Sequence, residues 1–318
     1  MTPEEQSLAE NNEFAALTAA ASTIMARELT GMETNAERKT KKQRVLKKKW
    51  ECFGLTFPQY AAELRSLPDL DAFVRRDLPQ HKAISLLVDL LFSDPFSPYE
   101  LKSDRKDFHN TLVAVAKLLG VSAERVDHLE KTQKEAMRAH KHVAWGKVVL
   151  WGAGGTIVLA VGGWFAAPWI AGGIGAAAGL SGAAATSYGL AILGGGSLAL
   201  GGSGMAGGMW IVTGAAATIG GGAFGGGTLL LQVGEANAKI ELLKLQVSYR
   251  EGLLRTQAEL GKAQSVITGL ETRRKEIEAK LEEEAELNDK NAHRIKELAA
   301  ILLAVEDSLK WIKKQKAA

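Results

Sequence analysis

The sequence predicts an all-α protein made of a cytosolic helical domain, a glycine-zipper transmembrane hairpin and a C-terminal long helix or coiled coil. Apolar residues recur at helical spacing before the middle of the chain. The stretch from Val148 to Gly234 then runs for 87 residues without Asp, Glu, Lys or Arg, and it holds 27 of the 34 glycines. After it, apolar residues follow a 3.5-residue repeat. The expected domains are residues 1–52, 53–144, 145–234 and 235–318.

The first segment, residues 4–30, is rich in alanine and suits a helix. Its apolar face is formed by Phe14, Leu17, Ala21, Ile24 and Leu29. No secretory signal is visible near Met1, since the following residues are acidic and polar. The part of the chain before the charge-free stretch is therefore expected in the cytosol.

A basic run follows, with eight Lys or Arg among residues 38–49. Such a run meets nucleic acid, anionic lipid or simply water. The absence of a base-reading motif makes nucleic acid an unlikely partner, whereas a membrane segment elsewhere in the chain favours lipid headgroups; a solvated helix face is the alternative. The predicted headgroup contacts are Lys41, Lys42, Arg44, Lys47, Lys48, Lys49 and, at the membrane entry, Trp145.

Residues 53–144 are predicted to form a small helical domain punctuated by prolines. One helix carries the apolar run from Ile84 to Phe92, and the next carries the face from Phe108 to Leu119. Gly120 is a plausible C-cap. Ser122 is a plausible N-cap of the helix that leads towards the membrane region.

The segment from Val88 to Glu130 resembles the core of the tellurite-resistance TerB-like helical domain. In that family, acidic residues of a loop are linked to metal binding. The resemblance implies Asp89, Asp94 and, beyond them, Glu100 as candidate metal ligands. Pro95 stands where the family has glycine, and the alternative is that Asp94 turns a loop. No cofactor and no other metal site are predicted.

The charge-free stretch is predicted to reside in a membrane. A spanning helix needs about 20 apolar residues, and small residues four apart let helix backbones approach closely. A soluble fold that hides the stretch until triggered, a buried core hairpin and a flexible linker are the alternatives. The stretch is also similar to the membrane segment of the transmembrane-and-coiled-coil hydrolase-like family, but no G-x-S-x-G nucleophile elbow accompanies it, so the resemblance implies no catalytic residue. The predicted packing positions are Gly175, Gly179, Gly204, Gly208, Gly222 and Gly226.

The charges beside the stretch predict an even number of crossings. Lys131, Lys134 and Arg138 lie before it, and Lys239, Lys244 and Arg250 lie after it. Basic residues mark the cytoplasmic side, so both termini are expected there. Two long spans with a tip around residues 181–203 are favoured over four short ones.

The C-terminal repeat predicts an apolar seam that another helix must cover. A single rod from 235 to 316 would need a partner, either a second copy or residues 1–50. A hairpin whose tip lies at residues 288–291 is the equal alternative. The predicted seam comprises Leu253, Leu260, Ile267, Leu270, Ile277, Leu281, Ile295, Leu298, Leu302, Val305, Leu309 and Ile312.

These features favour three functions, and no enzymatic activity is predicted. The first is an oligomeric protein that inserts into and permeabilises a bilayer in stress response or defence. The second is a constitutive membrane-anchored coiled-coil scaffold that recruits a cytosolic partner protein. The third is a metal-sensing TerB-like stress protein. The match of residues 202–207 to G-x-G-x-x-G is discounted because no acidic residue follows at the required distance.

Overall fold

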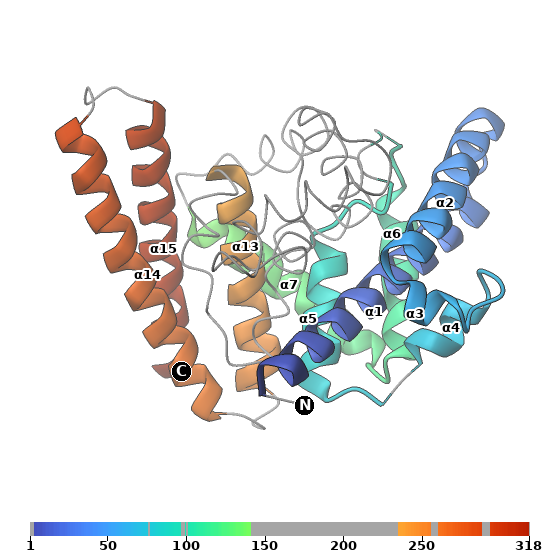
Figure 1. The fold of residues 1–318 in the computed structure, drawn as a ribbon, viewed down its shortest axis with the longest axis horizontal. Coiled ribbons are helices and arrows are strands. Elements are labelled where there is room, and N and C mark those ends of the chain that lie inside the picture. The colour runs from blue at the N-terminus through green and yellow to red at the C-terminus, as the bar shows by residue number, and fades with distance from the viewer. Residues whose placement is uncertain are drawn as a thin grey trace.

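The computed structural model describes residues 3–75, 77–96, 99, 101–140, 235–255, 260–287 and 293–317. Every regular element within these ranges is helical, which confirms the all-α class. Figure 1 shows an antiparallel helix pair at one end of the molecule, α1 to α4 at the other, and α5, α7 and α13 between them. The helices are α1 (Pro3–Met32), α2 (Ala36–Thr56), α3 (Pro58–Ala61), α4 (Asp69–Val74), α5 (Gln80–Leu91), α6 (Arg105–Leu118), α7 (Ala123–Ala139), α13 (Glu235–Ser248), the π-helix η3 (Tyr249–Leu254), α14 (Leu260–Leu287) and α15 (His293–Ala317).

Helix α1 is buried from Ala16 to Ala26 because α2, α4, α5 and α6 all pack against it. The predicted face is confirmed, since Phe14, Leu17, Ala21, Ile24 and Leu29 are all buried. The chain turns after α1, and the Asn35 side chain caps α2 by accepting a hydrogen bond from the backbone N–H of residue 38 at 2.9 Å. Small alanine side chains allow this close packing of α1.

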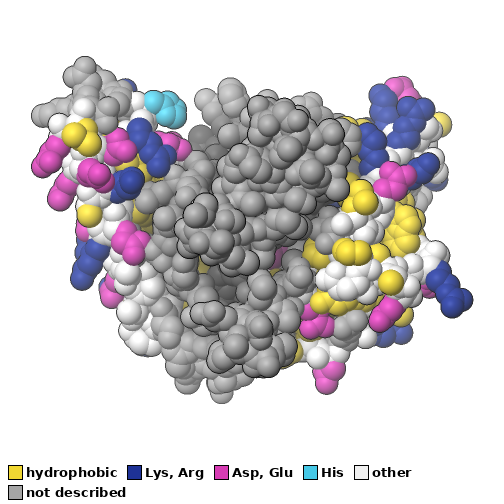
Figure 2. Space-filling model, viewed as in Figure 1, with side chains coloured by type: hydrophobic (Ala, Val, Ile, Leu, Met, Phe, Trp, Pro, Cys, Tyr) yellow, Lys and Arg dark blue, Asp and Glu magenta, His cyan; other side chains and the backbone are white. Residues whose placement is uncertain are grey.

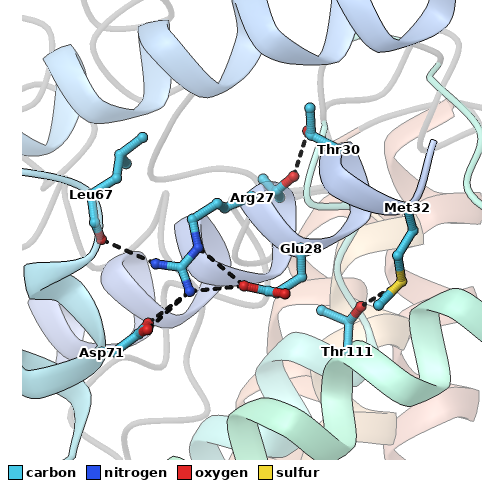
Figure 3. Close-up of polar contacts among 8 residues, drawn as sticks. Arg27, Glu28, Thr30, Met32, Leu67, Asp71 and Thr111 are labelled. Atoms are coloured by element: carbon cyan, nitrogen blue, oxygen red, sulfur yellow. Dashed lines mark hydrogen bonds and ion pairs between the residues drawn. The ribbon is translucent and has the colours of Figure 1, made fainter.

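Polar contacts also fix the end of α1 against its neighbours (Figure 3). The Arg27 guanidinium donates to the Leu67 carbonyl at 3.2 Å and to both carboxylate oxygens of Asp71 at 2.9 and 3.0 Å. On the other side, the Thr111 hydroxyl of α6 lies 3.9 Å from the Met32 sulfur. These contacts tie α1 to the loop before α4, to α4 itself and to α6.

Helix α5 lies at the centre of the fold and is buried from Ala83 to Leu91. It contacts α1, α6, α7, α13 and η3. Its neighbour α6 is capped by Asp104, whose carboxylate accepts from the backbone N–H of Lys106 at 2.7 Å. Helix α6 is followed by Gly120 at φ +70°, which confirms the predicted glycine C-cap.

The C-terminal part is a hairpin, and the alternative of one continuous rod is wrong. Helices α14 and α15 pack against each other, and Lys313 near the end of α15 reaches Glu271 of α14 at 2.6 Å. Helix α15 also packs on α13. The rod fails because α14 and α15 pack against each other in an antiparallel sense, which buries most of the seam within one chain.

Most of the predicted seam is buried in this arrangement. Leu281, Ile295 and Leu302 are only partly buried, and the side chain of Leu260 lies outside the described residues. Since the hairpin covers its own seam, the need for a second copy to cover it disappears, and self-association stays a prediction. The buried members are Leu253, Ile267, Leu270, Ile277, Leu298, Val305, Leu309 and Ile312.

The predicted membrane region, residues 145–234, lies outside the described residues, as do Trp145 and the six packing glycines. Of the helices that the structure describes, none combines the length and the apolar character that a bilayer crossing requires.

Candidate functional site

The helices that border the charge-free stretch pack against each other. Helix α7 ends at Ala139, and α13 begins at Glu235 on the far side of that stretch. His140 Nε2 lies 3.2 Å from Gln246 Oε1, while Glu135 pairs with Arg250 further along. The order of these pairs shows that the two segments contact each other in an antiparallel sense, and in Figure 1 α7 crosses α13 at an angle. The two ends of a long insertion are thus held together at its base. We call this contact the flank interface, formed by Arg125, Thr132, Glu135, His140, Gln246, Arg250 and Glu251.

Glu251 is the central residue of the flank interface. It is fully buried in η3, and its Oε1 accepts a 2.5 Å hydrogen bond from the Thr132 hydroxyl. Arg125 donates to the backbone carbonyl of Glu251 at 2.8 Å, and its Nη1 lies 3.8 Å from the carboxylate. Arg250 and Arg255 approach the same carboxylate at 3.6 and 3.4 Å. A buried carboxylate needs such partners because its desolvation is costly.

The pairing of Glu251 is incomplete within the described part of the chain. Its Oε2 has no hydrogen-bond partner there, and neither has Arg125 Nε. A buried polar group without a hydrogen bond costs about 1–3 kcal/mol. The element that carries Glu251 is a π-helix, a form found mostly as single turns at functional sites. The flank interface therefore contains several hydrogen bonds and ion pairs, but some of its buried polar atoms lack a hydrogen-bond partner among the described residues.

A second buried ion pair lies beside the flank interface and contains Asp89, one of the candidate metal ligands. The Lys244 ammonium of α13 lies 3.2 Å from the Asp89 carboxylate of α5, and both side chains are buried. Asp94 is elsewhere, in the turn after α5, where its carboxylate accepts from the backbone N–H of Phe96 at 2.8 Å. Glu100 lies outside the described residues. The structure does not bring Asp89 and Asp94 together because one pairs with a lysine and the other turns the chain. No group of three His, Cys, Asp or Glu suited to a metal exists in the described ranges.

The basic run of α2 is only partly a surface feature. Lys42 is buried, pairs with Glu33 at 2.9 Å and lies over the Phe96 ring. Lys49 is buried as well, which withdraws both lysines from the predicted headgroup contacts. Lys48 is half-buried, with its ammonium on the Tyr99 hydroxyl at 3.0 Å. Lys41, Arg44 and Lys47 remain exposed, and basic side chains gather over α2 in Figure 2.

Lys49 illustrates why the sequence misjudged this run. Its ammonium donates to the Ser22 hydroxyl of α1 at 3.0 Å. Burial lowers the pKa of Lys49 to about 7, and the charge of Asp94 only partly opposes that shift. A lysine inside a fold is rare, so a basic run ordinarily indicates a solvated face.

The exit-flank charges also behave differently from the expectation. Lys244 is fully buried, Lys239 is nearly so, and Arg250 pairs with Glu135. These residues form ion pairs within the protein, with Asp89, Glu235 and Glu135 respectively. The sequence analysis missed Thr132, Glu135 and Glu251 altogether. The only available signal was charge at Arg250, Glu251 and Arg255 within an otherwise apolar repeat.

Searches with family models, among curated proteins and among solved structures find no match to this chain.

Proposed function

We propose that this protein inserts its charge-free stretch into a lipid bilayer as a hairpin and permeabilises the membrane, while its helical body stays on one face. The flank interface is the observation that carries this proposal. Ends that lie on opposite faces of a bilayer would be separated by a hydrocarbon core about 30 Å thick. His140, directly after α7, contacts Gln246 of α13, and Thr132 of α7 donates to Glu251 of η3, so the two ends of the stretch start from the same face of the bilayer.

The composition of the stretch supplies the second half of the argument. Its 87 residues without Asp, Glu, Lys or Arg suffice for two long or four short spans. Its glycines allow close helix packing, and helices packed through glycine faces from several copies would enclose a pore. Gly175, Gly179, Gly204, Gly208, Gly222 and Gly226 are the proposed packing positions.

The exposed basic residues of α2 are consistent with a helical body that lies against one face of the bilayer. Lys41, Arg44 and Lys47 would contact acidic headgroups and hold the body against the membrane, since each basic residue near an anionic surface contributes about 1 kcal/mol. Self-association of the membrane hairpins is part of the proposal. A cytosolic partner protein is not required for it.

Dye release from liposomes tests the proposal. Full-length protein added to vesicles of phosphatidylcholine and phosphatidylserine should release an encapsulated dye. Gly179→Ile and Gly208→Ile should reduce release to background, because a branched side chain prevents close packing. Gly54→Ile is the matched control, since Gly54 lies in α2 and a Cβ there would meet no atom within 4 Å. Release no greater than that of protein-free vesicles contradicts the proposal.

The second candidate is a constitutive membrane anchor without a pore. The closed packing of α13 between α5, α7 and α15 favours it, because a permanent anchor needs no rearrangement. Vesicle binding without dye release would support the anchor. The metal-sensing alternative has no comparable support, since the Asp89 carboxylate is paired with Lys244.

A further inference from the structure

Helix α13 and η3 bury side chains on every side. Apolar and polar side chains are interspersed around α13, and those that the structure describes from Ala238 to Ser248 are all buried. In this structure α13 is a core helix covered by α5, α7 and α15. Its buried apolar residues are Ala238, Ile240, Leu242, Leu243, Leu245 and Val247.

The same segment buries more polarity than a stable core helix needs. Its buried polar residues are Lys239, Lys244, Gln246, Ser248 and Glu251. Gln246 Nε2, Ser248 Oγ, Tyr249 Oη and Glu251 Oε2 lack a hydrogen-bond partner among the described residues. Buried ion pairs often contribute less than apolar packing of the same volume, and unpaired polar atoms weaken the packing further.

The π-helix adds a structural reason for weak retention. Gly252 of η3 packs against α5, where an added Cβ would be in ordinary contact at 3.6 Å from Ile84 Cγ2 and 3.7 Å from the His81 carbonyl oxygen. The π form is held by this packing, since π-helices are rare and occur mainly as single turns. Release from α5 would allow η3 to return to an α-helix.

We propose that α13 and η3 are a concealed lipid-binding element, locked in the fold by the flank interface and released onto an anionic bilayer during insertion. Once released, Ile240, Leu243 and Val247 enter the interfacial region, while Lys239 and Lys244 reach acidic headgroups. On a helix, Ile240, Leu243 and Val247 share one side with Lys239 and Lys244 at its edges, so the apolar residues enter the interface while the lysine side chains extend to the headgroups. This inference rests on the proposed membrane insertion and adds the identity of the element that opens.

Two Thr→Val substitutions, each nearly isosteric with the threonine that it replaces, test whether the flank interface holds η3 in the fold. Thr132→Val removes the donor to Glu251 without changing side-chain shape. Thr111→Val is the control, since Thr111 is equally buried but its hydroxyl has only the weak contact with the Met32 sulfur. In buffer, hydrogen exchange of full-length protein should be about tenfold faster at η3 and the end of α13 in Thr132→Val than in Thr111→Val. Equal exchange in the two variants overturns the lock.

Vesicles test the release. When vesicles of phosphatidylcholine and phosphatidylserine are added to wild-type protein in D2O, backbone amides of η3 and of the facing side of α7 should exchange faster than in buffer. In a separate measurement, Thr132→Val should release dye from such vesicles about tenfold faster than Thr111→Val. Dye release with unchanged protection of η3 and α7 overturns the inference and leaves the proposed function standing. Absence of any dye release contradicts the proposed function, while the comparison in buffer still decides whether the lock exists.

A second pair of variants tests the same inference if Thr132→Val does not fold. Arg250→Gln breaks the pair with Glu135 at a partly exposed position, and Arg274→Gln breaks the pair with Glu278 on α14. Faster exchange of η3 in Arg250→Gln alone supports the lock. Equal exchange of η3 in both variants contradicts it.

Discussion

The Thr132 hydroxyl donates a 2.5 Å hydrogen bond to the Glu251 carboxylate, although 119 positions and the entire charge-free stretch separate the two residues. This contact connects α7 directly to η3. It means that the helical body is assembled from both sides of the stretch, and the proposed membrane hairpin therefore begins and ends on one structural unit.

The Asp89–Lys244 pair gives a direct stability prediction. Asp89→Asn leaves a buried ammonium without its carboxylate and should lower the free energy of unfolding by about 3–5 kcal/mol. Replacing both residues, as Asp89→Leu with Lys244→Met, should recover most of that loss because no unpaired charge remains. Urea unfolding followed by circular dichroism measures both. Glu271→Gln, which breaks an exposed pair with Lys313, is the control, and a loss as small as that of the control would contradict the prediction.

The buried Lys49 predicts a pH dependence of stability. Burial lowers the pKa of Lys49 from 10.5 to about 7, so between these values the unfolded chain binds the proton more tightly than the fold. The free energy of unfolding should therefore rise with pH from about 7 towards 10.5 and gain nothing from Lys49 below pH 7. Lys49→Met should flatten this rise, whereas the exposed Lys47→Met should keep it. Identical slopes in wild type and Lys49→Met would show that Lys49 does not titrate in this range.

The hairpin seam predicts different results for two leucines of α15. Leu298 is fully buried, and Leu298→Ala should lower the free energy of unfolding by about 2–5 kcal/mol through cavity formation. Leu303 is 40% exposed, so Leu303→Ala should cost far less. The unfolding midpoint should not depend on protein concentration, because one chain covers the seam. Strong concentration dependence lost in Leu303→Ala would indicate instead that a second copy packs on that face.

The exposed face of α2 predicts charge-dependent lipid binding. Arg44→Glu combined with Lys47→Glu should weaken binding to phosphatidylserine-containing vesicles by at least about tenfold. Lys313→Glu combined with Lys314→Glu makes the same charge change on exposed positions of α15 and should have a smaller effect. Vesicle co-sedimentation at low and high salt measures this. Equal losses from both pairs would mean that net charge, rather than α2, governs binding.

Local features of the chain were predictable where they depend on neighbouring residues. The apolar face of α1 and the glycine C-cap at Gly120 follow from spacing and backbone geometry, and both are confirmed. The burial of Lys42 and Lys49 was not predictable. Their partners Glu33 and Ser22 look like ordinary surface residues in the sequence. Packing of α2 against α1 encloses Lys49, and the Phe96 ring and Ser103 help to enclose Lys42.

The heptad seam shows the same limit. Its period predicts that a partner helix covers it, but a period carries no information on whether that partner is the same chain or another. In the structure, the chain reverses direction between α14 and α15, so the helix that covers the seam belongs to the same chain.

By itself, the sequence determined that the described chain is helical, where its apolar faces lie, and that 87 residues carry no charge. Tertiary structure alone decided that α7 and α13 meet, that Asp89 neutralises Lys244, and that Glu251 is enclosed by Thr132 and three arginines. The physical reason is the range of the interactions. Helix formation and capping act within a few residues, whereas buried charge is tolerated only where partners distant in the chain are brought within hydrogen-bonding reach.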